Sequence, residues 1–339
     1  GSIVHFDQIS KENNLIYNNT SFYFLYMSTI KQPPKIIFGK NSVQEFSFPK
    51  KCLVITSKGA RSRGWLEHTG LSNQIIFDTV ESNPSLKTTE KIISKFKNFD
   101  FSHIVGIGGG SSMDVAKFCA FKMNKKKIMI PTTFGSGSEV TRISVLKVDG
   151  KKQSFHNDDY FADVAIVDPH FIINTSYEII KNSAIDACAQ CSEAFDSLNG
   201  NPYTRFLCEK AFVHLENSIL NDKFDELPYG SLLTGLGFGN SSTTLGHALS
   251  YVFSNEGYSH GHALAFTTAI AHKFNKSKFY ERFNNIVKKL DFKQIHLQQN
   301  LEEASDIILQ DRKHLDNNPN KVYKKDIISL LNSINSGKV

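Results

Sequence analysis

Short apolar segments alternate with longer amphipathic ones through the first half of the chain. The short segments are typical of buried strands and lie at residues 35–39, 52–56, 74–77, 103–107 and 127–130. Between them, apolar positions recur at helical spacing over residues 85–99 and 112–123. Strands separated by helices of this length predict βαβ units, and therefore a mostly parallel sheet with helices on both faces.

The pattern changes near residue 175. Helical periodicity dominates from residue 176 onward, interrupted by turn signals at residues 199–202, 227–228 and 317–319. The sequence therefore predicts an α/β half over residues 27–175 and an all-helical half over residues 176–339.

The N-terminal segment fits neither half. Gly1-Ser2 resembles a cloning remnant, and residues 3–26 have aromatic residues but no basic region followed by a signal-peptide core. We expect residues 1–26 to be a leader or a cloning-derived extension, with Met27 as a candidate natural start.

Composition and charge narrow the class of protein. Of 339 residues, 40% are hydrophobic and 21% are charged, which is typical of a soluble globular protein. No apolar run approaches the roughly 20 residues that a membrane helix needs. The net charge of +6 comes from scattered lysines, so we expect small anionic molecules as partners, and neither nucleic acid nor a membrane.

Five cysteines, an odd number, argue against a disulfide framework and indicate a reducing, cytoplasmic location. Cys188 and Cys191 have the spacing of a CxxC motif, but they lie in the middle of a predicted helix and no second pair exists. We therefore expect both thiols to be buried packing groups.

Candidate metal ligands cluster in the helical half. Asp186 and Gln190 are four residues apart in a predicted helix, so they share one face. His247 lies in a second apolar-periodic helix, and His260 follows in a glycine-flanked turn. One carboxylate, one amide and two imidazoles suit a divalent metal of intermediate hardness, Zn²⁺ or Fe²⁺.

A glycine-rich segment, residues 105–114, runs from a predicted strand into a predicted helix. Its glycines allow close approach of an anion, and the helix start aims free N–H groups at a phosphate. A tight strand-to-helix turn is the structural alternative, and the spacing matches neither a Walker loop nor GxGxxG. The residues expected to contact a nucleotide are Gly108, Gly109, Gly110, Ser111 and Asp114, with Lys117 one turn later.

A second loop, residues 130–141, also follows a predicted strand. It carries hydroxyls at Thr132, Thr133 and Ser136, and two glycines give access to them. At the carboxyl end of a parallel sheet the two loops would form the walls of a nucleotide crevice.

Five ordered segments resemble the iron-containing (group III) alcohol dehydrogenases. They correspond to that family's pyrophosphate loop, its second cofactor loop, the strand before its helical domain and its two metal segments: residues 106–117, 130–141, 165–169, 183–195 and 246–263. The resemblance extends from about residue 33 to residue 334. It implies a dinucleotide-binding α/β domain followed by an all-helical metal-binding domain, the fold also found in dehydroquinate synthase.

Two positions depart from that family's pattern. Asp186, His247 and His260 match its metal ligands, but Gln190 stands where most members have a fourth ligand, a histidine. Tyr251 stands where many members carry another histidine near the nicotinamide. The glutamine and the surrounding HALSY sequence resemble a branch that includes phosphonoacetaldehyde reductases.

The resemblance implies metal-dependent reduction of a short aldehyde by NADPH or NADH, with Fe²⁺ or Zn²⁺ as the metal. In the branch named above, the reaction is phosphonoacetaldehyde to 2-hydroxyethylphosphonate. Tyr251, His262 or a water relayed to the ribose would deliver the proton, and the sequence leaves these three open. A structural, hydrogen-bonded role is the alternative for His262.

Substrate and cofactor selectivity have candidates in two loops. Arg142 is the expected partner of a phosphonate, with Lys152 and His156 behind it. Ser57 replaces the acidic residue that repels a 2′-phosphate in the family, so NADPH is allowed. The basic residues that could pair with that phosphate are Lys58, Arg61 and Arg63.

Two other functions remain open. One is a non-redox enzyme similar to dehydroquinate synthase, although the segment 243–263 lacks that enzyme's dense set of lysines and arginines. The other is a nucleotide-binding protein that has lost its metal through the change at Gln190. A homodimer is one of the assemblies that the sequence leaves open.

Overall fold

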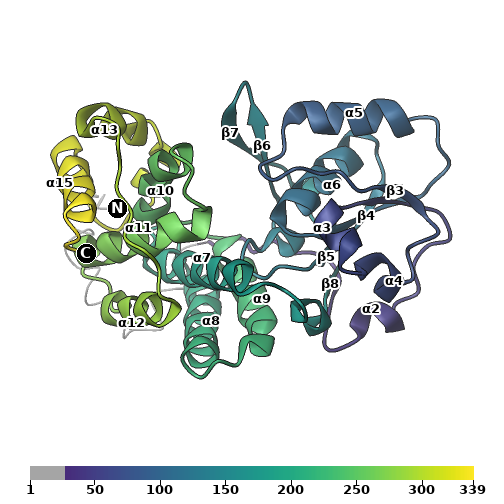
Figure 1. Ribbon diagram of the computed structural model, residues 1–339, viewed down its shortest axis with the longest axis horizontal. Coiled ribbons are helices and arrows are strands. Elements are labelled where there is room, and N and C mark those ends of the chain that lie inside the picture. Colours follow the sequence, from purple (N-terminus) through teal and green to yellow (C-terminus); the bar gives the residue numbers. More distant parts are fainter. Residues whose placement is uncertain (1–26) are drawn as a thin grey trace, which may run out of the picture. The chain divides into compact units, whose positions relative to one another are not determined.

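The computed structural model describes residues 27–339, so the segment expected to be a leader or extension, residues 1–26, lies outside the described residues. Residues 32–339 fold as one compact unit. Its first half is built on a parallel sheet, and its second half consists of helices (Figure 1).

The sheet has six parallel strands in the order β1-β8-β5-β4-β2-β3. The predicted strands all form. The apolar runs of the central strands are buried because these strands are covered on both faces, whereas the edge strands β1 and β3 are only partly buried. The bounds are β1 (Ile36–Phe38), β2 (Cys52–Ile55), β3 (Ile75–Phe77), β4 (His103–Gly108), β5 (Lys126–Pro131) and β8 (Val164–Val167).

Helix α6 (Gly110–Lys122) connects β4 to β5 and packs against both strands. It therefore begins directly at the carboxyl end of β4, where the glycine-rich segment was located. The remaining helices of this half are α2 (Ser42–Glu45), α3 (Lys58–Ser62), α4 (Trp65–Thr69) and α5 (Leu86–Phe96), with 3₁₀ turns η4 (Ser138–Val140), η5 (Asp158–Tyr160) and η6 (Pro169–Ile172).

A two-stranded antiparallel hairpin, β6 (Ile143–Val148) and β7 (Lys151–His156), was not expected from the sequence. Its turn residues, Asp149 and Gly150, both have positive φ angles of 49° and 80°. The residues of β7 are mostly exposed and polar, so the strand carries no hydrophobic alternation. The hairpin packs on α6 through β6 and extends beside the helical half (Figure 1).

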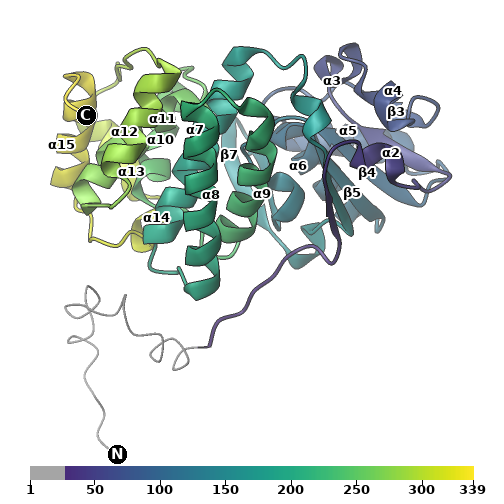
Figure 2. The ribbon, with the colours of Figure 1, turned by 90° about the horizontal axis from the view of Figure 1, so that it is seen from below.

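The helical half begins at α7 (Tyr177–Asp196), close to the boundary expected at residue 175. Helices α7, α8 and α9 pack against one another (Figure 2). Cys188 and Cys191 of α7 are buried free thiols, as predicted, and Cys52, Cys119 and Cys208 are buried free thiols as well. Among the described residues, no helix combines the length and the hydropathy needed to cross a bilayer. The other helices are α8 (Pro202–Leu220), η7 (Phe224–Glu226), α9 (Leu227–Phe238), α10 (Leu245–Asn255), α11 (His260–Asn275), α12 (Tyr280–Leu290), α13 (Leu301–Leu309), α14 (Arg312–Asp316) and α15 (Lys324–Asn335).

Candidate metal and nucleotide site

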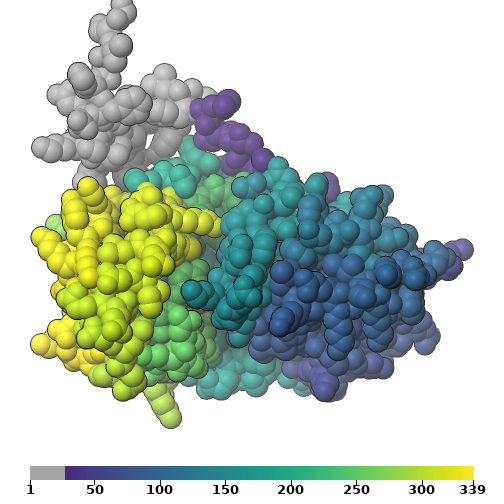
Figure 3. Space-filling model, turned by 90° about the horizontal axis from the view of Figure 1, so that it is seen from above, coloured from purple at the N-terminus to yellow at the C-terminus, as the bar shows by residue number. Residues whose placement is uncertain are grey.

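One cleft of about 330 Å³ collects residues from both halves of the unit. Figure 3 shows the face on which the teal and blue α/β half adjoins the green and yellow helical half. The cleft therefore brings the first glycine loop, the second loop, the hairpin and the helical half's ligand candidates to one place. Its polar lining includes Gly110, Ser111, Asp114, Ser136, Lys147, Lys152, Asp186, Gln190, His247, Tyr251, His260, Lys313 and His314.

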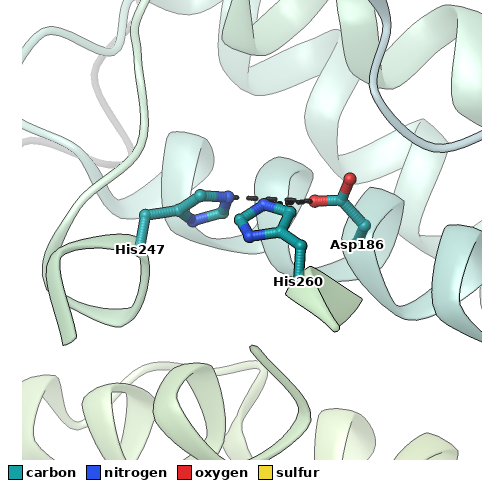
Figure 4. A group of neighbouring side chains, drawn as sticks. All are labelled: Asp186, His247 and His260. Atoms are coloured by element: carbon teal, nitrogen blue, oxygen red, sulfur yellow. Dashed lines mark ion pairs between the residues drawn. The ribbon is translucent and has the colours of Figure 1, made fainter. Parts of the chain in front are cut away.

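Three of the predicted metal ligands meet in this cleft (Figure 4). Oδ1 of Asp186 lies 3.4 Å from Nε2 of His260 and 3.9 Å from Nε2 of His247. The three ligand atoms all lie within 4.8 Å of one another. Asp186 and His247 are buried and His260 is partly exposed, so the group is open to a small molecule on one side.

A buried glutamate that the sequence analysis did not identify orients His247. Nδ1 of His247 donates to Oε2 of Glu193 at 2.7 Å, which leaves Nε2 directed toward Asp186. Burial alone would raise the pKa of Glu193, but the charge and hydrogen bond of His247 outweigh it and hold that pKa at about 2. Glu193 is therefore ionised, as a carboxylate that supports a metal-binding histidine must be.

Gln190 lies beside the group, and its amide is half-satisfied. Nε2 of Gln190 donates to Oδ1 of Asp186 at 3.0 Å. Oε1 is buried without a hydrogen-bond partner among the described residues. Such an orphaned oxygen beside two imidazoles and a carboxylate fits a divalent metal such as Zn²⁺ or Fe²⁺, with or without Gln190 as a fourth ligand.

The close packing of α11 on α7 brings His260 to Asp186. A Cβ atom on Gly261 would lie 2.3 Å from the backbone oxygen of Asn182, so only glycine allows this approach. The side chain of Asn182 also accepts hydrogen bonds from Ser259 and from the backbone of His262. The start of α11 is thereby fixed one turn before Asp186 along α7.

The glycine-rich segment has the form expected of an anion-binding turn. Gly108 has φ of 147°, and a Cβ there would lie 2.8 Å from the hydroxyl oxygen of Ser112. Gly109 and Gly110 pack closely on the hydroxyls of the second loop. The N-terminus of α6 opens into the cleft at Gly110 and Ser111, where its free N–H groups can face a phosphate.

Asp114 and Lys117 hold the second loop in place. Asp114 accepts hydrogen bonds from Ser138 Oγ at 2.6 Å and from the backbone of Val145 at 3.0 Å. Nζ of the fully buried Lys117 donates to the backbone oxygens of Ser138 and Thr141. Burial raises the pKa of Asp114 and lowers that of Lys117 to about 8. These two side chains connect the loops that would enclose a nucleotide.

The second-loop candidates separate into two groups. Ser136 faces the cleft, whereas Thr132 and Thr133 line a smaller neighbouring cavity together with residues of α7.

Ser57 lies at the carboxyl end of β2, the neighbour of β4, and its Oγ accepts from the backbone of Ala60 as the N-cap of α3. It lies outside the lining of the cleft.

The two candidate proton donors are placed differently. Tyr251 lines the cleft, and burial raises the pKa of its hydroxyl, so the group stays protonated. His262 does not line the cleft, because its Nε2 lies 2.6 Å from the backbone oxygen of Lys293. Its ring packs near Tyr258 and Phe292, which is the structural role that the sequence left open.

The residues proposed for anion recognition are also divided. Arg142 does not line the cleft, and its Nη1 forms an ion pair with Asp158 at 2.8 Å. Lys152 does line it, together with Lys147 and a residue that the sequence analysis missed, Lys313. His156 lies 2.9 Å from Nζ of Lys313. The structure therefore places lysines, and not Arg142, in the lining of the cleft that contains the metal cluster.

His314 is a histidine of the cleft that the sequence analysis missed. Its Nδ1 lies 2.7 and 2.9 Å from the two carboxylate oxygens of Asp311, three residues earlier. Its ring stacks on that of His247, with centroids 6.1 Å apart, and lies at the same distance from that of Tyr251. The cleft thus contains two imidazoles, His247 and His314, each oriented by its own carboxylate.

Comparison with known proteins agrees with this geometry. Residues 33–169 match the family profile described as iron-containing alcohol dehydrogenase, and residues 180–310 match the C-terminal profile of the same family. The chain is 33% identical over 215 residues to long-chain-alcohol dehydrogenase 1 of Geobacillus thermodenitrificans, covering 55% of this chain and 54% of that protein. The chain therefore spans about half the length of this curated relative.

Two further relatives are both named sulfoacetaldehyde reductase. A sulfoacetaldehyde reductase of Bilophila wadsworthia is 25% identical over 282 residues, covering 71% of this chain and 73% of that protein. The crystal structure of a sulfoacetaldehyde reductase from Bifidobacterium kashiwanohense in complex with NAD⁺ superposes with a TM-score of 0.82 at 21% identity, covering 92% and 99% of the two chains. This structural likeness confirms the predicted fold.

Proposed function

This chain belongs to the iron-containing alcohol dehydrogenase family, and we propose that it is a metal-dependent NAD(P)H oxidoreductase that reduces a short aldehyde to a primary alcohol. One observation carries the proposal. Asp186, His247 and His260 form a metal-binding group in the same cleft as the N-terminus of α6, where Gly110 and Ser111 lie. Hydride transfer needs a nicotinamide and an electrophile side by side, and this cleft offers a seat for each.

The residues divide the work of the reaction. A divalent Zn²⁺ or Fe²⁺ ion, when bound, acts as a Lewis acid on the aldehyde oxygen. Glu193 keeps His247 in the tautomer whose Nε2 faces Asp186. The N-terminus of α6 binds the pyrophosphate, and the loop pinned by Asp114 and Lys117 excludes water from the nucleotide.

The reaction consumes one aldehyde, one NAD(P)H and one proton, and gives the alcohol and NAD(P)⁺. The buried hydroxyl of Tyr251 remains protonated in the cleft and can donate a hydrogen bond to the oxygen that becomes negative. We assign the role to Tyr251 and not to His262, whose ring lies outside the cleft lining.

Within this activity, we propose the conversion of phosphonoacetaldehyde to 2-hydroxyethylphosphonate. Gln190 and the sequence around His247 support it through their resemblance to that branch. A relative named sulfoacetaldehyde reductase acts, by its name, on a two-carbon aldehyde with a similar anionic end.

The test is reconstitution of the full chain. Protein stripped with a chelator is loaded with Fe²⁺ without oxygen, or with Zn²⁺, and NADPH or NADH oxidation is followed with phosphonoacetaldehyde, sulfoacetaldehyde and propanal. We expect activity only after metal loading. Stoichiometric metal and cofactor binding without hydride transfer to any aldehyde would favour the dehydroquinate synthase-like alternative. Failure to bind either metal would favour a protein that only binds nucleotide.

A further inference from the structure

Three lysines line the cleft without a carboxylate partner: Lys147, Lys152 and Lys313. In the part of the chain that the structure describes, none of them forms an ion pair, whereas Arg142 nearby is paired with Asp158. Unpaired cations that face a cleft attract anionic ligands. A lysine on a solvated surface is often unpaired as well, so a lysine that serves as a binding group must also be held in place.

Lys313 of α14 is held in this way by a hydrogen bond to His156 of β7, a residue 157 positions away in the sequence and in the other half of the unit. Nζ of Lys313 lies 2.9 Å from Nε2 of His156. Burial, and then the charges of Lys313 and Arg142, lower the pKa of His156 to about 4, so the ring is neutral and its Nε2 can accept the hydrogen bond.

The hydrogen bond to His156 holds the ammonium group of Lys313 in place and leaves other N–H donors of that group available. An ammonium group has three N–H donors, and His156 takes one of those on Lys313. Asp311 is the acidic residue two positions before Lys313. Both of its carboxylate oxygens contact Nδ1 of His314 instead. Lys313 is therefore held in place by a neutral acceptor, and its charge is not cancelled by an ion pair.

The position of Lys313 relates it to the substrate. The next residue, His314, has its ring stacked on that of the candidate ligand His247. Lys313 and His314 line the same cleft as Asp186 and His260. A short molecule whose carbonyl oxygen reaches the metal group would therefore occupy the same cleft as the ammonium group of Lys313.

We propose that Lys313, oriented by His156, is the specificity-determining residue that binds a terminal oxyanion on a short aldehyde substrate. The substrate class is then a two- to four-carbon aldehyde ending in a phosphonate, sulfonate or carboxylate. This inference rests on the proposed aldehyde reductase function and refines it. It also replaces Arg142, which lies outside the cleft lining, as the anion-recognising residue.

Kinetics of paired substrates test this assignment. The metal-loaded wild type, Lys313→Met, Lys313→Arg and Arg142→Met are compared on sulfoacetaldehyde and propanal, which share a short aldehyde but differ in the charged end. Lys325→Met is the matched control, because Lys325 is exposed on α15 and its loss removes one charge away from the cleft. Binding of the product-like 2-hydroxyethylphosphonate is measured by calorimetry on the same proteins.

We expect Lys313→Met to raise KM for sulfoacetaldehyde roughly 10- to 100-fold, as loss of a charge-assisted hydrogen bond would, and to change KM for propanal less than about twofold. Lys313→Arg should recover most of the loss, and binding of 2-hydroxyethylphosphonate should weaken in parallel in Lys313→Met. Equal effects on both aldehydes, an effect on KM for NADPH alone, or the same shift in Lys325→Met would each overturn the assignment. So would a selective shift in Arg142→Met with none in Lys313→Met.

Failure of the proposed function has a different signature. If the wild type reduces no aldehyde, the reductase assignment fails, and binding of 2-hydroxyethylphosphonate still reports on the anion seat. Weaker binding in Lys313→Met would then support Lys313 as an anion-binding residue, and unchanged binding would overturn that role as well.

Discussion

Nδ1 of His247 donates a hydrogen bond to Oε2 of Glu193, and the two atoms lie 2.7 Å apart in the interior of the helical half. The other carboxylate oxygen of Glu193 accepts from the backbone N–H groups of His247 and Thr244. Oε2 also accepts from the hydroxyl of Thr268 on α11. One carboxylate therefore connects the three helices α7, α10 and α11 that present the metal group.

Replacement of Glu193 by glutamine should weaken metal binding. An amide has one acceptor oxygen, so either orientation places its NH₂ group against an N–H donor that the carboxylate now accepts. We expect metal affinity to fall roughly 10- to 100-fold, and the free energy of unfolding to fall by about 1–3 kcal/mol. Competition with a chelator and urea denaturation measure the two effects. Glu209→Gln, which removes a surface ion pair with Lys278, is the control and should change neither.

Replacement of Gln190 by histidine should strengthen metal binding. The amide of Gln190 uses its NH₂ group on Asp186 and leaves Oε1 unpartnered among the described residues. An imidazole at the same place would offer a better ligand to Zn²⁺ or Fe²⁺ than an amide oxygen does. Chelator competition should show tighter binding in Gln190→His than in wild type. Weaker binding would mean that the glutamine itself is the fitted ligand.

Replacement of Ser57 by aspartate should shift cofactor preference from NADPH toward NADH. Ser57 follows β2 and caps α3 through its side chain, and aspartate is an equally good N-cap, so the fold should tolerate the change. A carboxylate beside the ribose would repel a 2′-phosphate. The ratio of kcat/KM for the two cofactors measures the shift, with Ser57→Asn as the uncharged control. An unchanged ratio in Ser57→Asp would place the ribose elsewhere.

The fold could be predicted from the sequence because the central strands of the sheet are buried on both faces. Residues 52–56 and 103–107 are mostly apolar runs. Such a run predicts a buried strand without any need to decide which of its faces contacts solvent. The hairpin of β6 and β7 escaped the same reasoning because β7 is polar and exposed. The Asp149-Gly150 turn was nevertheless a recognisable hairpin signal.

Helical spacing could predict only those site residues that share one face of a helix. Asp186 and Gln190 share a face, and Glu193, three residues further on, continues that face, so the same spacing rule could have found it. The rule also shows why His260 and His262 cannot both face the cleft. Residues two apart in a helix point in different directions, and both lie in α11.

The contact between Lys313 and His156 had no local signal. It joins two polar segments that are 157 positions apart in the sequence and belong to different halves of the unit. Spacing in the sequence can identify ligands on one helix. It cannot indicate which of the 39 lysine and arginine side chains face a cleft. For that reason the sequence pointed to Arg142, the cation closest to the second cofactor loop.

Acidification should destabilise the protein partly through His272, which is buried on α11 with Nε2 2.7 Å from the hydroxyl of Ser192. Burial lowers the pKa of His272 to about 4, below its usual value of 6.5. Between these values the unfolded chain binds more protons, so this contribution is complete above pH 6.5 and is lost as pH falls toward 4, by no more than about 3 kcal/mol. His272→Gln should show a smaller decrease in unfolding free energy from pH 7 to pH 5. Parallel decreases would contradict this role.

Replacement of Gly261 by alanine should separate the metal ligands. A Cβ at this position would lie 2.3 Å from the backbone oxygen of Asn182, so α11 must move away from α7 by about 1 Å and carry His260 away from Asp186. We expect loss of high-affinity metal binding together with reduced stability. Gly257→Ala is the control, because it strains a residue with φ of 97° but meets no neighbouring atom within 4 Å. The control should lose stability and keep its metal affinity. Retained metal affinity in Gly261→Ala would show that the close packing of these helices does not set the ligand geometry.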